Sequence, residues 1–107
     1  MTEQILASLL EEVKSNLQIT WDDEETNKSL QGIIKRAEAY LLNLTSAPSF
    51  DFSKDDDPKS LLLERCRYVY NNSADEFETN YQSELNRLIL RVALDIRKTE
   101  VKTDGQI

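Results

Sequence analysis

The chain lacks the residues on which many enzyme active sites depend. Its 107 residues include no histidine, one cysteine and two glycines. Without a histidine to act as a base, Cys66 is predicted to be a core thiol and not a nucleophile. Gly32 falls inside a predicted helix and Gly105 near the end of the chain, so there is no glycine-rich phosphate-binding loop. The sequence therefore predicts a protein that is not an enzyme and has no catalytic residue, no cofactor and no metal site.

Features of membrane and secreted proteins are also missing. No apolar run approaches the roughly 18–20 residues that span a bilayer, so no membrane association is expected. The N-terminal segment has no basic start and carries acidic residues early, unlike a signal peptide. A single cysteine cannot build a disulfide framework within one chain, so the cytosol is the expected compartment.

Positive charge is the scarcer of the two signs. The chain has 13 basic and 20 acidic residues, a net charge of −7. This balance disfavours sequence-independent binding to DNA, whose affinity comes largely from Lys and Arg on phosphates. It does not exclude a protein that surrounds DNA without gripping it.

Amphipathic helix is the dominant pattern that is present. The strongest example is residues 23–44, where apolar residues recur at steps of three and four. They are Leu30, Ile33, Ile34, Ala37, Tyr40, Leu41 and Leu44. A helix of this length is roughly 30 Å long, and its single apolar stripe needs partners throughout. The four acidic residues at 22–25 are predicted to start it, with Thr20 or Asp22 as the cap, in preference to a calcium site.

Three further segments show the same helical period and are predicted to pack against the long helix. Ser73 and Glu76 have the spacing of a capping box ahead of the last of them. The three predicted helices are 3–17, 58–71 and 74–97.

These elements predict an all-α fold, a small bundle of about four helices. A long polar loop at 45–57 connects the second and third helices. The bundle is expected to form a single helical domain at 1–98, followed by a flexible tail at 99–107 that has no apolar period.

The loop and the last helix hold the candidates for contacts with partners. Phe50 and Phe52 are expected to pin the loop onto the core; a short strand or a contact with a neighbouring subunit is the alternative. The aspartates at 55–57 are interpreted as a solvated charge run in preference to a cation site. The cations late in the last helix suit its dipole and could also touch phosphates or an acidic partner. The candidate interface residues are Phe50, Phe52, Arg91, Arg97, Lys98, Val101, Lys102 and Ile107.

Residues 9–94 resemble the phage head–tail connector, or head-completion adaptor, family of siphovirus-type tailed phages. The first half has the family's short helix ending in L-x-I, at Leu17 and Ile19, and then the acidic turn at 22–25. The long helix follows with an A-x-x-Y-L rhythm. The second half has a Y-x-N element, Tyr70 to Asn72, ahead of the last helix.

The resemblance implies a structural virion protein that is monomeric when free. In the virion such proteins form a ring, typically a dodecamer, which docks on the portal protein and extends the DNA channel. The ring receives the next connector, stopper or tail-completion protein, and DNA passes through without specific binding. The expected location is the head–tail interface of the virion, with the host cytoplasm during assembly. The family has no active-site residues to carry over.

Two other functions remain open from the residues themselves. The negative charge also suits an acidic helical inhibitor or DNA mimic that binds a basic protein. An enzyme that uses the aspartate clusters with a metal or a nucleotide is a minor alternative.

Overall fold

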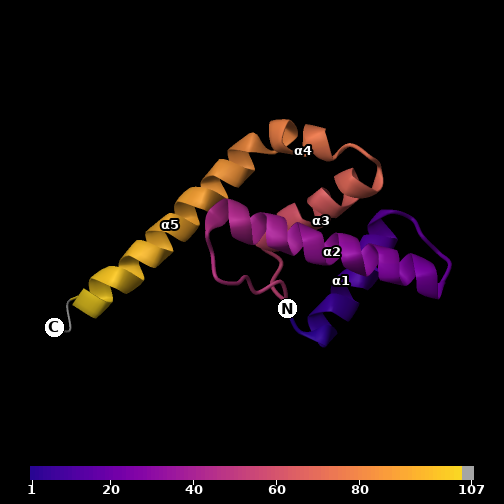
Figure 1. Cartoon of the computed structure of the whole chain (residues 1–107), viewed down its shortest axis with the longest axis horizontal. Coiled ribbons are helices and arrows are strands. Elements are labelled where there is room, and N and C mark those ends of the chain that lie inside the picture. The colour runs from indigo at the N-terminus through magenta and orange to yellow at the C-terminus, as the bar shows by residue number, and fades with distance from the viewer. Residues whose placement is uncertain (105–107) are drawn as a thin grey trace.

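The computed structural model describes the backbone of residues 1–104 and the side chains of residues 1–98, and all the regular secondary structure in this part of the chain is α-helix (Figure 1). The all-α prediction is confirmed, with five helices in the described residues in place of about four. They are α1 (Glu3–Asn16), α2 (Glu24–Thr45), α3 (Asp57–Tyr70), α4 (Ala74–Asn80) and α5 (Gln82–Asp104).

Helix α2 is the centre of the bundle and packs against α1, α3 and α5. Its apolar stripe is buried over most of its length, and Ile34 and Leu41 are completely inaccessible to solvent. The helix starts at the acidic turn, as predicted, but neither Thr20 nor Asp22 caps it. Asp23 is the cap, and its carboxylate accepts hydrogen bonds from the amide and hydroxyl of Thr26 at 3.0 and 2.9 Å. The predicted long helix is confirmed almost to the residue.

The loop between α2 and α3 is fixed to the bundle by its aromatic residues. Phe52 is fully buried in the core, and Phe50 packs against it with the ring centroids 5.9 Å apart. The expectation that these residues pin the loop onto the core is confirmed. The alternative of a short strand is wrong, because the loop has no strand.

The predicted helix at 74–97 is broken at Tyr81, and this break produces the fifth helix. Tyr81 has φ −115° and ψ 20°, outside helical geometry, and separates α4 from α5. Its ring stacks on the buried Phe77 at 5.1 Å, and its hydroxyl donates to Glu64 at 2.8 Å. The break lets α4 direct Phe77 into the core while α5 departs in another direction (Figure 1). The capping box is not formed: the Glu76 amide donates to the backbone carbonyl of Ser73 at 3.0 Å, and the Ser73 hydroxyl donates to the carbonyl of Asn71.

Helix α5 is longer than predicted and leaves the bundle. Among the residues whose side chains the structure describes, the last buried one is Val92, and residues 93–98 are all exposed. The backbone stays helical to Asp104, beyond the predicted end at residue 97. Residues 99–104 of the predicted tail are therefore helical. The flexibility of the tail and the domain boundary at residue 98 stay predictions, and residues 105–107 lie outside the described residues. Figure 1 shows the result as a rod that projects from the bundle.

Candidate docking surface

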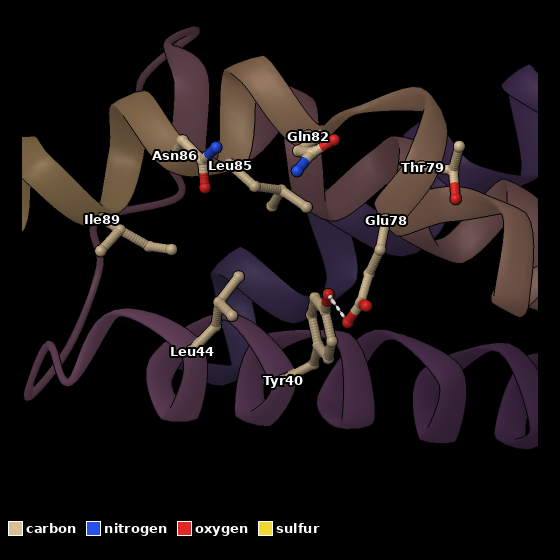
Figure 2. Close-up of a pocket in the computed structure, with 8 residues that line it drawn as sticks. All are labelled: Tyr40, Leu44, Glu78, Thr79, Gln82, Leu85, Asn86 and Ile89. Carbon is tan, nitrogen blue, oxygen red and sulfur yellow. Dashed lines mark hydrogen bonds between the residues drawn. The ribbon is translucent and has the colours of Figure 1, made fainter.

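A groove runs between the C-terminal half of α2 and the α4–α5 corner, and we call it the α2–α5 groove (Figure 2). Its volume is about 340 Å³. Apolar side chains from both walls face the opening, and polar side chains from α4 and α5 surround it. The lining residues are Tyr40, Leu44, Glu78, Thr79, Gln82, Leu85, Asn86 and Ile89.

A hydrogen bond from Tyr40 to Glu78 closes one end of the groove, as Figure 2 shows. The phenol oxygen lies 2.7 Å from the carboxylate, and the Arg65 guanidinium lies 4.1 Å from the centre of the Tyr40 ring. Partial burial and the bond to Glu78 raise the pKa of the Tyr40 phenol to about 12. The phenol therefore stays protonated at neutral pH and acts as a donor that holds Glu78 at the rim.

A second, smaller groove lies on the other side of α5, against the α2–α3 loop. Its volume is about 180 Å³, and its lining includes Phe50 from the loop and Arg91 from α5. Two of the residues predicted to contact partners are therefore brought to one place. Phe52 is not available beside them, because it is 1% exposed and belongs to the core.

The other predicted contact residues belong to the projecting part of α5. Arg97 and Lys98 are exposed there. The side chains of Val101 and Lys102, and all of Ile107, lie outside the described residues. The assignment of these residues to an interface stays a prediction.

Two exposed leucines on α5 escaped the sequence prediction. Leu90 is 61% exposed and Leu94 is 49% exposed, and neither was among the residues predicted to contact partners. Their spacing gave a usable signal, because they fall off the stripe formed by Leu85, Leu88 and Val92. That signal separates two faces of the helix but does not say that the second face is bare.

Charge is distributed unequally between the bundle and the projecting helix. Residues 1–81 hold 16 acidic and 8 basic side chains, a net charge of −8. Residues 87–98 hold four basic and one acidic side chain, a net charge of +3. The exposed part of α5 is thus a cationic extension of an acidic body.

The aspartate run at 55–57 takes part in ion pairs with neighbouring elements. Lys59, itself largely buried, lies 2.7 Å from the carboxylate of Asp55 and 3.0 Å from that of Glu12 on α1. Asp57 lies 3.5 Å from Arg87 on α5. Asp57 therefore ties the start of α3 to α5, and Lys59 links Asp55 in the loop to Glu12 on α1, contacts that the interpretation as a solvated charge run did not include.

The described part of the chain offers little for catalysis. Cys66 is completely buried, as predicted, and burial raises the pKa of its thiol to about 12, so the thiolate is not formed at neutral pH. Residues 1–98 contain no cluster of three or more acidic or cysteine side chains that could hold a metal ion. Within the described helices, none is long and apolar enough to cross a membrane. What this part of the chain offers is exposed surface, in the two grooves and on the projecting part of α5.

Comparison with protein families gives a match over most of the chain. The family model of the phage gp6-like head–tail connector proteins matches residues 7–93. The match ends one residue after Val92, which is the last buried residue of α5 among the described side chains. Comparison with curated proteins and with solved structures finds no significant match. Since the family model covers most of the chain, the protein belongs to the phage gp6-like head–tail connector family.

Proposed function

We propose that the protein is a head-completion adaptor that docks as a ring on the phage portal, extends the DNA channel and receives the next connector, stopper or tail-completion protein. The observation that carries this proposal is the family match over residues 7–93. The free protein is a monomer in the host cytoplasm, and the assembled ring, a dodecamer, lies at the head–tail interface of the virion.

Two features of the chain support this function. The acidic body, with a net charge of −8 over residues 1–81, suits the wall of a channel through which the DNA duplex slides, because it repels phosphates. The exposed part of α5 and the smaller groove, which is lined by Phe50 and Arg91 among others, offer side chains for assembly. The proposed contacts with the portal and other partners use Phe50, Arg91, Arg97 and Lys98, together with Val101, Lys102 and Ile107 further along the chain.

The test is capture by purified portal rings, followed by light scattering on the separated complex. We expect the free protein to have the mass of one chain and the complex to hold about twelve copies per ring. Charge reversal of Arg91 and Lys98 should reduce capture, whereas reversal of Lys28, on α2 in the bundle, should not. A protein that stays monomeric beside intact portal rings would contradict the proposal.

A second candidate function, an acidic inhibitor or DNA mimic, is favoured by the same net charge of the body. It predicts binding to a basic protein that weakens steeply as salt rises, because exposed charges are screened. Docking on a portal through the cations of α5 is also weakened by salt, but it should depend on Arg91 and Lys98, whereas binding of a basic protein by the acidic body should not. Charge reversal of Arg91 and Lys98, tested on whichever complex forms, therefore separates the two functions.

A further inference from the structure

Helix α5 carries an apolar contact surface on the side that faces away from the bundle. Leu90 and Leu94, which we call the leucine pair, are four residues apart and so lie on one face of the helix. They are 61% and 49% exposed. Arg97 and Lys98 follow Leu94 by three and four residues, which places cations beside the pair. Exposed leucines flanked by cations are suited to an apolar groove in an acidic surface.

The protein has such a groove, but a single molecule cannot fill it with its own leucine pair. Gln82, Leu85 and Ile89 form one wall of the α2–α5 groove, and they belong to the same continuous helix as the pair. A helix is a stiff rod, so Leu94 cannot return to this wall without breaking α5. A leucine pair that enters the groove must therefore come from another molecule.

The groove matches the leucine pair in both polarity and charge. Leu44, Leu85 and Ile89 supply an apolar floor, and the Glu78 carboxylate is held at the rim by Tyr40. The surrounding body has a net charge of −8, whereas residues 87–98 have a net charge of +3. The segment that complements the groove of one copy is therefore present on each neighbouring copy of the chain.

We propose that the leucine pair of one copy packs into the α2–α5 groove of the next copy. The inference rests on the proposed function, because it supplies the contact between copies that a ring requires. The two surfaces differ, so each copy offers its α5 to one neighbour and accepts α5 from the other. Repetition of such a contact closes into a ring when the rotation between copies permits.

Disulfide trapping between two singly substituted proteins tests this contact. One protein carries Leu94→Cys and the other carries Thr79→Cys, an exposed position in the lining of the groove. The native Cys66 is completely buried and does not interfere. Oxidation of the mixture, alone and on portal rings, should give mainly the mixed dimer. Ser29→Cys, on the N-terminal half of α2, is the control and should pair with Leu94→Cys only at background level.

A second substitution shows whether the apolar contact holds the pair together. Adding Leu90→Glu to the Leu94→Cys protein should lower the yield of mixed dimer at least about tenfold, the effect expected from losing one buried leucine. Ser29→Glu, which makes the same change in charge, should leave the yield unchanged. Equal losses from both substitutions would overturn the proposal.

The outcomes separate this inference from the proposed function. Portal rings that capture the protein without the bond between positions 94 and 79 would overturn the inference and leave the function standing. A mixed dimer in solution, with no capture by the portal, would support the inference and contradict the function. Dimers of the Leu94→Cys protein with itself would show that the projecting helices pair with each other, which also overturns the inference.

Discussion

Helices α2 and α5 are nearly equal in length, at 22 and 23 residues, yet they differ in how much of their apolar surface is buried. The stripe of α2 is buried from Leu30 to Leu41, whereas α5 buries nothing in its described part after Val92. The difference comes from neighbours, because α2 lies between other helices and α5 runs past the end of the bundle (Figure 1). Length and amphipathic period therefore identify a helix, but the packing around it decides which part becomes core.

The largest expected effect is a contrast between equivalent substitutions in the two helices. Leu41→Asp places an unpaired charge at a position with no solvent exposure and should lower the free energy of unfolding by about 3–5 kcal/mol. Leu94→Asp, on the exposed face of α5, should change it by less than about 0.5 kcal/mol. Urea denaturation of both variants measures the contrast. Equal losses would mean that the two helices are packed alike.

The next effect separates the two phenylalanines of the loop. Phe52→Ala should cost about 3–5 kcal/mol, because it empties a fully buried site. Phe50→Ala should cost clearly less, because Phe50 is only partly buried, and it should weaken capture by the portal if this residue belongs to the interface. Thermal melts and portal capture of the two variants give the comparison. A Phe50 variant that melts as low as the Phe52 variant would place both residues in the core.

A smaller effect concerns the ion pair that holds the loop end to α3. The hydrogen bond from Lys59 keeps the pKa of the Asp55 carboxyl below its ordinary value of 3.8. A lowered carboxyl pKa stabilises the folded state above the ordinary value, and this stabilisation is lost as the pH falls through the folded value. Asp55→Asn should therefore lower the urea midpoint at pH 6, and the difference from the native chain should shrink as the pH falls below 3.8. The matched control is Asp75→Asn. If the change in urea midpoint caused by Asp55→Asn did not depend on pH, the charge of the Asp55 carboxylate would not contribute to stability.

The smallest effect is expected from removing residues 99–107. The last buried side chain described on α5 is Val92, and residues 93–98 are exposed, so the melting temperature should stay within about 1–2 °C of that of the full chain. Truncation after Asn86 also removes Leu88 and Val92 from the core and should lower the melting temperature strongly. Differential scanning calorimetry of the two truncated chains measures both effects. A sharp drop for the shorter deletion would mean that the end of α5 is packed.

Much of the fold was predictable because local rules and packing agree there. The acidic turn at 22–25 and the stripe that follows specify α2, and the structure places its ends within a residue or two of the prediction. Where a local signal competed with packing, packing prevailed. The apolar period runs through Tyr81, but its stacking on Phe77 and its bond to Glu64 accompany a break in the helix. The capping box at Ser73 likewise gave way to another hydrogen bond.

The docking surface was predictable only in part. Arg97 and Lys98 were identified from their charge and are indeed exposed. Phe50 and Phe52 were identified as aromatic residues of the loop, and this property did not distinguish Phe50 at a groove from Phe52 in the core. The α2–α5 groove joins Tyr40 and Leu44 to residues some forty positions later. No local pattern encodes such a meeting, because it depends on the angle at which α5 leaves α4.

The sequence by itself determined where α1 to α4 begin, which face of each is apolar, the lack of histidine-based chemistry and the acidic character of the body. These properties depend on residues within a few positions of one another, through helix period, capping and composition. Only the tertiary structure decided that Lys59 bridges α1 and the loop, that Phe52 is core, and that Leu90 and Leu94 are bare. These properties depend on which distant segments lie beside each residue, because burial and ion pairing arise from neighbours in space.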